Sequence, residues 1–154
     1  IAEVAAWANE QNKSLYQILK EIYKEFGFYK EGLISLTKKG ISGSEEIKNM
    51  MYKFRNDPPK QIHGTKVIEI KDYKSSISKD IISGIETAIN LPKSDVLQFI
   101  TEDGTKISVR PSGTEPKIKF YFGIKASLND ISEFYTVNNE LDNRISELAK
   151  LFSE

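Results

Sequence analysis

The residue types that could do chemistry are concentrated between residues 110 and 117, which read Arg-Pro-Ser-Gly-Thr-Glu-Pro-Lys. Arg110 carries a planar guanidinium whose paired N–H groups match the oxygens of a phosphate. Ser112 and Thr114 add hydroxyl donors, and Gly113 allows its backbone N–H to approach a ligand closely. The stretch therefore has the composition of a clamp that holds a phosphate without a metal ion.

The two ends of this stretch restrict its backbone and add a charge. Pro111 and Pro116 limit the freedom of the loop, so less entropy is lost when a ligand binds. Lys117 adds a second cation after Arg110. The same residue types also favour turns between strands, whatever the function. Composition alone therefore leaves two interpretations open, a phosphate clamp and a plain turn.

Glu115 is the one acidic residue in the stretch. A carboxylate beside a phosphate clamp repels the phosphate, so we do not expect Glu115 to face that group. It is expected to orient Arg110 or Lys117, or to meet a sugar hydroxyl.

Other candidate groups have simpler interpretations. His63 is the only histidine and has no visible partner in the sequence, so we interpret it as a surface residue and not a general base. Glu102 and Asp103 form either a carboxylate pair for a metal or, more simply, the polar tip of a hairpin before Gly104. No nucleophile–base set, Walker loop or metal-ligand spacing is visible, so we name no catalytic residue and no metal ligand.

The composition excludes several classes of protein. Lys and Arg total 22, as do Asp and Glu, and this balance argues against a nucleic-acid partner. The absence of Cys and the single His exclude a disulfide scaffold, a Cys-based zinc site and a His-rich metal centre. No segment approaches the ~20 apolar residues of a membrane span, and no signal-peptide pattern is visible. We therefore expect no membrane partner and a cytoplasmic location.

Apolar residues recur at three- and four-residue spacing in several segments, which predicts helices. The chain opens in one of them. The most clearly marked helix covers residues 15–26, because Ser14 and Gln17 form a capping-box pattern before it and Gly27 suits its end. A further helix is ended by Pro58-Pro59, and a long one closes the chain. The apolar stripes of these last two helices are Ile47, Met50, Met51 and Phe54, and Phe134, Leu141, Ile145, Leu148 and Phe152.

Alternating residues predict strands over 28–38, 67–70 and 117–125, and a hairpin over 95–110. The isoleucines of residues 73–94 fit either a short helix or a long ordered loop. Hairpin-like links favour a mostly antiparallel sheet with helices packed on one face, which is an α+β fold.

Residues 110–121, ending Lys-Ile-Lys-Phe-Tyr, closely resemble the phosphate-binding loop of the α-D-phosphohexomutases. These are the four-domain phosphoglucomutase/phosphomannomutase enzymes, and the loop lies in their C-terminal domain. The resemblance extends more loosely over the flanking hairpin and strand and over residues 26–32. The Lys-Ile-Lys-Phe-Tyr continuation resembles the bacterial phosphoglucomutase type more than the phosphoglucosamine mutase type.

The resemblance implies a TATA-binding-protein-like α+β fold and a domain division. Residues 28–154 would be the C-terminal, fourth domain, and residues 1–27 the helical end of the preceding domain and the connection. It also implies which residues bind the substrate phosphate that is not reacting: Arg110, Ser112, Gly113, Thr114 and Lys117.

The same resemblance implies a reaction that this chain does not complete. The family interconverts hexose 1-phosphate and 6-phosphate through a hexose 1,6-bisphosphate, with Mg²⁺ and a phosphoserine. The loops that carry the phosphoserine, the Mg²⁺ and the sugar contacts belong to the first three domains and are not found in this sequence. We therefore expect no bound cofactor and no mutase activity from the chain alone, and expect its partners to be a phosphosugar and the other three domains.

Two alternatives remain at this stage. The domain could belong to a phosphomannomutase or a phosphoglucosamine mutase. It could also be a stand-alone module that binds a phospho-ligand or a protein, which an exposed sheet face rich in aromatic or basic residues would favour.

Overall fold

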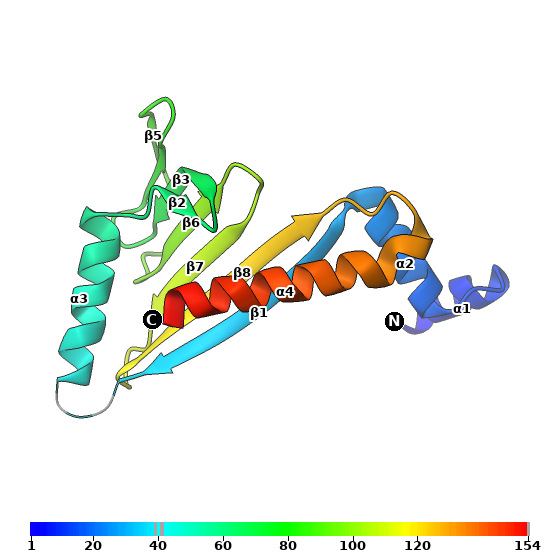
Figure 1. Ribbon diagram of the computed structural model, residues 1–154, viewed down its shortest axis with the longest axis horizontal. Coiled ribbons are helices and arrows are strands. Elements are labelled where there is room, and N and C mark those ends of the chain that lie inside the picture. The colour runs from blue at the N-terminus through cyan, green and yellow to red at the C-terminus, as the bar shows by residue number, and fades with distance from the viewer. Residues whose placement is uncertain (39, 41, 154) are drawn as a thin grey trace. The chain divides into compact units, whose positions relative to one another are not determined.

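The computed structural model describes residues 1–38, 40 and 42–153 (Figure 1). The described residues divide into two compact units. The helical unit comprises Ile1–Lys30 and Lys125–Arg144, and the sheet unit comprises Glu31–Ile124 and Ile145–Glu154. None of the helices described is both long enough and apolar enough to span a bilayer.

The helical unit begins with α1 (Ala2–Glu10) and α2 (Leu15–Phe26). The predicted capping box of α2 is confirmed: the Gln17 N–H donates to Ser14 Oγ over 3.2 Å, and the Ser14 N–H donates to Gln17 Oε1 over 2.7 Å. Helix α2 ends at Gly27, which has a φ of 98°. Residues that carry a Cβ rarely adopt this conformation. The cap and the glycine together fix both ends of this helix.

An aromatic stack forms the core of the helical unit. The ring of Phe28, which is 3% exposed, lies 4.2 Å from that of Tyr23 and 5.0 Å from that of Phe134. Phe134 begins α4 (Phe134–Ser153), directly after the short 3-10 helix η1 (Ile131–Glu133). This stack joins residues from both ends of the sequence.

The sheet unit is built on one sheet, which has eight strands in the part of the chain that the structure describes. Along the sheet the order is β1-β8-β7-β6-β3-β4-β5, with β2 paired to β3, and every pairing from β2 to β8 is antiparallel. The strands are β1 (Phe28–Thr37), β2 (Gln61–Ile62), β3 (Thr65–Asp72), β4 (Ile77–Asp80), β5 (Glu86–Ala88), β6 (Leu97–Thr101), β7 (Lys106–Pro111) and β8 (Lys117–Ala126).

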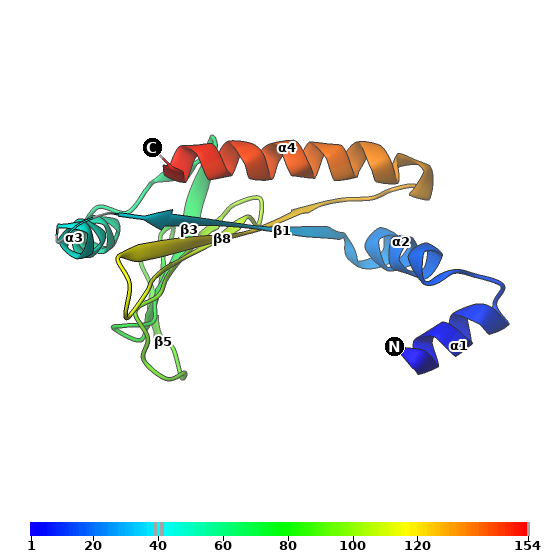
Figure 2. The same ribbon diagram turned by 90° about the horizontal axis from the view of Figure 1, so that it is seen from below.

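The buried face of this sheet is covered by α3 (Gly43–Asn56) and by the end of α4. Phe54 of α3 lies 6.1 Å from the ring of Phe120, and Phe152 of α4 lies 5.1 Å from the same ring. Figure 2 shows the C-terminal end of α4 on one side of the sheet. Both helices pack on one face of an antiparallel sheet, so the predicted α+β fold is confirmed.

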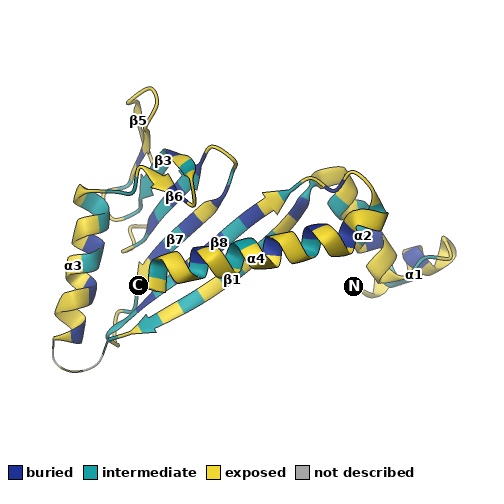
Figure 3. Cartoon of the chain, in the orientation of Figure 1, coloured by how far each residue is buried: buried dark blue, intermediate teal, exposed yellow. Residues whose placement is uncertain are grey.

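Strand β8 shows how the sequence separates the two faces of the sheet. Its buried residues are Ile118, Phe120, Phe122 and Ile124, each no more than 1% exposed. The residues between them, from Lys117 to Lys125, point to the other face and are more exposed (Figure 3). A period of two residues in the sequence therefore fixes which side chains can reach a ligand on the open face.

Residues 73–94 differ from both predictions made for them. They form a hairpin of β4 and β5, and not a short helix or a long loop. The Asp80 carboxylate accepts the N–H groups of Ile82 (2.9 Å) and Ser83 (2.7 Å), and Gly84 has a φ of 74°. These local bonds make a turn, so the apolar spacing that suggested a helix does not mark a buried face.

His63 has a partner that the sequence did not reveal. It lies in the turn between β2 and β3, with a φ of 49°, and its Nε2 is 2.8 Å from the Glu147 carboxylate. The interpretation of His63 as a surface residue is confirmed, since the residue is exposed. The predicted hairpin tip at Glu102–Gly104 is confirmed, since the Asp103 carboxylate accepts the Thr105 N–H at 3.0 Å.

Candidate phosphate-binding site

The site is a tight loop between two paired strands, β7 and β8. The register sets Arg110 opposite Lys119 and Pro111 opposite Ile118. Beyond that point the Ser112 N–H donates to the Lys117 carbonyl over 2.7 Å, which closes the loop over residues 112–117. The hairpin therefore holds its two ends fixed, as a preorganised binding loop requires.

The loop is also attached to the elements around it. The Lys38 N–H donates to the Pro116 carbonyl over 2.9 Å, which joins the loop to the end of β1. Helix α3 starts close by, and a Cβ on Gly43 would lie 2.7 Å from the Lys38 carbonyl oxygen. A glycine at the start of α3 therefore allows the chain to pass close to this anchor.

Ser112 is oriented by the backbone of the same loop. Its Oγ accepts the N–H of Glu115 at 3.3 Å. A hydroxyl has one hydrogen and two acceptor positions. Because one acceptor position is used within the loop, the hydrogen of Ser112 remains available to donate to a ligand.

Gly113 stands at the open part of the loop. A Cβ built on it would meet no atom within 4 Å, so the chain itself does not require a glycine at this position. Among the described residues, the N–H groups of Gly113 and Thr114 donate no backbone hydrogen bond. The loop therefore has two unengaged N–H donors, at Gly113 and Thr114, and open space around Gly113 through which a ligand can approach.

One pocket lies on the open face of the sheet, and we call it the strand-side pocket. It has a volume of about 190 Å³. Its lining residues are Arg110, Pro111, Ser112, Gly113, Lys119 and Tyr121. The structure therefore brings three of the predicted site residues together with two residues that the sequence analysis did not select.

Lys119 and Tyr121 were missed because they lie in a strand and not in the loop. Their positions were nevertheless encoded in the sequence: Ile118 and Phe120 alternate with them, and the hairpin register places Lys119 opposite Arg110. Combining the two-residue period of β8 with the register of the hairpin would have found both.

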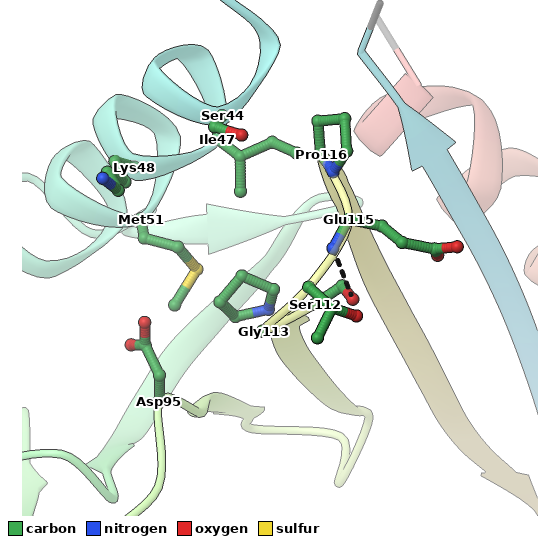
Figure 4. Close-up of a pocket in the computed structure, with 11 residues that line it drawn as sticks. Ser44, Ile47, Lys48, Met51, Asp95, Ser112, Gly113, Glu115 and Pro116 are labelled. Atoms are coloured by element: carbon green, nitrogen blue, oxygen red, sulfur yellow. Dashed lines mark hydrogen bonds between the residues drawn. The ribbon is translucent and has the colours of Figure 1, made fainter. Parts of the chain in front are cut away.

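A second pocket lies on the other side of the loop, between it and α3, and we call it the α3-side pocket (Figure 4). Its volume is about 300 Å³. It is lined by Ser44, Ile47, Lys48, Met51, Asp95 and residues 111–116. Thr114 lines this pocket and not the strand-side pocket, although Ser112 and Gly113 line both.

Lys117 lines neither pocket, whereas its partner Glu115 lines the α3-side pocket. The Lys117 ammonium donates to the Glu115 carboxylate over 2.9 Å. The pKa of Glu115 is held below its ordinary value, first by that hydrogen bond and then by the charge of Lys117, with a weaker influence of Lys119. Burial opposes this shift but does not cancel it. Of the expected roles for Glu115, the contact with Lys117 is the one present in this geometry.

The chemistry available at the loop is donation of hydrogen bonds and positive charge. Among the described residues, no group of three or more His, Cys, Asp or Glu side chains is arranged to hold a metal ion. The loop residues 110–117 include no histidine or cysteine. The arrangement therefore suits binding of an anion.

Comparison with known proteins agrees with these features. Residues 58–133 match the family described as "Phosphoglucomutase/phosphomannomutase, C-terminal domain", and the loop at 110–117 lies inside that stretch. A phosphoglucomutase of Staphylococcus aureus (strain bovine RF122 / ET3-1) is 38% identical over 122 residues, and one of Staphylococcus saprophyticus is 35% identical over 123. A solved structure of the Paramecium phosphoprotein pp63/parafusin, in its open form, aligns with 96% of this chain and with 25% of the parafusin chain. The two are 16% identical in sequence, with a TM-score of 0.46.

The extent of these matches shows what part of an enzyme is present. The aligned region covers 79% of this chain but only 22% of each staphylococcal phosphoglucomutase. The resemblance first noted over residues 110–121 thus extends well beyond the loop, across its hairpin and the neighbouring strands. The chain contains a C-terminal domain of the phosphoglucomutase/phosphomannomutase family.

Proposed function

We propose that the loop at 110–117 binds a phosphate group of a phosphohexose within a longer phosphoglucomutase-type enzyme. One observation carries the proposal: two cationic side chains, a hydroxyl and an unengaged backbone N–H converge on one small pocket. Among the described residues, neither Arg110 nor Lys119 forms an ion pair with a carboxylate. Their charges remain available for a ligand that carries about two negative charges, as a phosphate monoester does.

Each group has a separate role in this proposal. Arg110 offers two parallel N–H donors to two phosphate oxygens, while Lys119 approaches as a point charge. Ser112 donates its hydroxyl hydrogen, and Gly113 donates its backbone N–H group. Every contact is a donor or a cation, so the loop holds the phosphate without activating it.

The proposed function is therefore positioning. A phosphohexomutase transfers a phosphoryl group at one end of the sugar while the phosphate at the other end is held. Holding the phosphate that does not react orients the other end of the sugar for phosphoryl transfer, so binding energy is used to position the reacting groups. The Mg²⁺ that supports phosphoryl transfer does not fit the described residues, which offer no cluster for it, and we assign it to other domains of the enzyme.

The magnitude of binding supports a role within a larger protein. Charge-assisted hydrogen bonds contribute about 1.5–3 kcal/mol each, and the cost of the ligand's and loop's lost freedom is subtracted from their sum. Four or five of them on an open loop correspond to a net of about −4 kcal/mol, or a roughly millimolar Kd. Tight binding then requires the other domains to enclose the sugar. We expect no mutase activity from this chain alone.

The identity of the relatives favours glucose phosphates as the first substrates to test. The S. aureus and S. saprophyticus proteins that are 35–38% identical are phosphoglucomutases by name. The sugar itself is expected to be read by the domains outside this chain, so phosphomannomutase and phosphoglucosamine mutase activities are the alternatives for the whole enzyme.

Amide NMR of the 154-residue chain provides the test. Titration with inorganic phosphate, and separately with glucose 1,6-bisphosphate, should shift the N–H signals of Gly113, Thr114 and Lys119. The shifts should saturate in the millimolar range, at about the affinity estimated above. Glucose without phosphate is the control and should leave these signals unchanged. No shift in residues 110–119 at about 50 mM phosphate, far above the expected Kd, would contradict the proposal.

A further inference from the structure

The loop contains an ion pair that does not line the proposed phosphate pocket. The Lys117 ammonium and the Glu115 carboxylate are 2.9 Å apart, and their side chains are 30% and 60% exposed. Neither residue lines the strand-side pocket. Lys117 thus has a partner within the loop, whereas among the described residues Arg110 and Lys119 have no carboxylate partner.

Glu115 and Lys117 also share the backbone bonds that close the loop. The Glu115 N–H donates to Ser112 Oγ, and its carbonyl accepts the Lys117 N–H over 2.7 Å. The Lys117 carbonyl in turn accepts the Ser112 N–H. Together with the ion pair, these contacts link residues 112, 115 and 117 in a closed ring, and the orientation of the Ser112 hydroxyl depends on it.

The charges explain why such a pair suits a phosphate loop. An unpaired carboxylate at 115 would repel a phosphate, and an unpaired ammonium at 117 would compete with Arg110 for it. Paired, the two side chains have no net charge. The strand-side pocket then keeps the two positive charges of Arg110 and Lys119, which match a phosphate monoester dianion.

We propose that Glu115 and Lys117 are positioning residues, an internal brace that sets the shape of the loop, and that neither contacts the phosphate. This inference rests on the proposed phosphate binding at the same loop. It differs from the expectation drawn from the family resemblance, which places Lys117 among the phosphate ligands. It assigns Glu115 a function that requires its negative charge.

The direction in which Glu115→Gln changes the affinity for phosphate distinguishes a positioning role of Lys117 from a role as a phosphate ligand. If the pair is a brace, Glu115→Gln should weaken binding of inorganic phosphate by about twofold to fivefold, because the loop loses an ordering contact. Lys117→Met should weaken it by a similar factor, and the double variant should be no weaker than either single variant. If Lys117 is instead a ligand, Glu115→Gln frees it and should tighten binding, while Lys117→Met weakens it strongly. That second result would overturn the inference.

A structural readout and a matched control complete the test. In the Glu115→Gln variant, amide hydrogen exchange of Ser112 and Lys117 should become faster, since both N–H groups bond within the ring; unchanged exchange would contradict the brace. Lys79 and Glu86 form a comparable exposed pair in the β4–β5 hairpin, 3.3 Å apart. Lys79→Met and Glu86→Gln should leave phosphate binding unchanged.

Arg110→Ala distinguishes the failure of this inference from the failure of the proposed function. If Arg110→Ala and Lys119→Met leave phosphate binding unaltered, the loop is not the phosphate site and the brace has no such function. If both abolish binding while Glu115→Gln tightens it, the phosphate site stands and only the brace is wrong.

Discussion

At the scale of single residues, the proposed phosphate site depends on which charges remain unpaired. Arg110 and Lys119 face each other across the β7–β8 pairing, and Glu115 neutralises Lys117 beside them. The β7–β8 hairpin therefore contains cations of two kinds: Arg110 and Lys119 line the strand-side pocket, and Lys117 pairs with Glu115. Substitutions at these positions should have different consequences.

Arg110 should be the most sensitive position. Arg110→Ala removes two charge-assisted hydrogen bonds and should weaken phosphate binding about tenfold to a hundredfold. Arg110→Lys should recover only part of that loss, since an ammonium cannot make the paired contact of a guanidinium. Titration by amide NMR measures both. Equal affinities for the arginine and lysine forms would show that charge alone matters there.

Lys119 should matter through its charge and its place on β8. Lys119→Met should weaken phosphate binding and reduce its dependence on salt, because one cation no longer contributes. Lys106 is the matched control: it lies in the same unit, on the same face of β7 as Arg110 and four residues or about 13 Å from it. Lys106→Met should leave phosphate binding as it was. A comparable loss in both variants would point to a general charge effect.

The loop residues could be selected as candidates from the sequence because their chemistry is local. Arg110, Ser112, Gly113 and Thr114 stand within five positions, and each type has a recognisable use around a phosphate. Lys119 lies outside that stretch and looks like any surface lysine. Its place in the pocket depends on pairing between two strands, which is a property of the fold and not of the neighbouring residues.

At the scale of elements, β8 joins the core to the site. Phe120 is fully buried between Phe54 and Phe152, while its neighbour Tyr121 faces the strand-side pocket. Phe120→Ala should lower the free energy of unfolding by about 3–5 kcal/mol, and Phe120→Leu by less. Tyr121→Ala should change it little, since Tyr121 is 38% exposed. Urea denaturation measures all three, and similar losses for Phe120→Ala and Tyr121→Ala would contradict this division of faces.

The β4–β5 hairpin shows where sequence periodicity misled. Ile81, Ile82 and Ile85 have helical spacing, yet they are 42%, 79% and 61% exposed. The turn is set by Asp80, whose carboxylate accepts two N–H groups, and by Gly84 in a left-handed conformation. A pattern of apolar residues indicates a helix only when a core covers one face, and here the local side-chain bonds decide the structure.

The turn gives a prediction for pH. The backbone and hydroxyl of Ser83, and then the Ile82 N–H, lower the pKa of Asp80 despite slight burial. Because the pKa of Asp80 is lower in the folded protein, the ionised carboxylate stabilises the fold. That stabilisation is present above the ordinary carboxyl pKa and is lost as pH falls through the folded pKa. The amide signals of Ile82 and Ser83 should titrate with that lowered midpoint. In Asp80→Asn the titration should vanish; a midpoint at or above the ordinary value would refute the bonding.

At the scale of the whole molecule, the candidate site lies within the sheet unit, and the helical unit has its own aromatic core. The sequence predicted a boundary after residue 27, and that division remains a prediction. The stack of Tyr23 on Phe28 crosses it, with ring centroids 4.2 Å apart. The helices of residues 1–27 therefore contribute to the folding of the residues that follow.

Removal of residues 1–27 tests this dependence. The chain 28–154 should keep its phosphate-induced shifts at the loop, since those residues lie in the sheet unit. It should have a lower midpoint of thermal unfolding, because Phe28 and Phe134 lose the ring of Tyr23 that covers them. An unchanged midpoint would instead support residues 28–154 as an independent domain.

The hydrogen bond from the Glu115 N–H to Ser112 Oγ has a consequence for selectivity. It leaves the serine with one hydrogen to donate and one further acceptor position, whereas Arg110, Lys119 and the Gly113 N–H can only donate hydrogens. A phosphate oxygen that carries its own proton would therefore face mostly donors and lose hydrogen bonds. We therefore expect the loop to bind the phosphate dianion more tightly than the monoanion, so its affinity for phosphate should fall as pH drops below about 6.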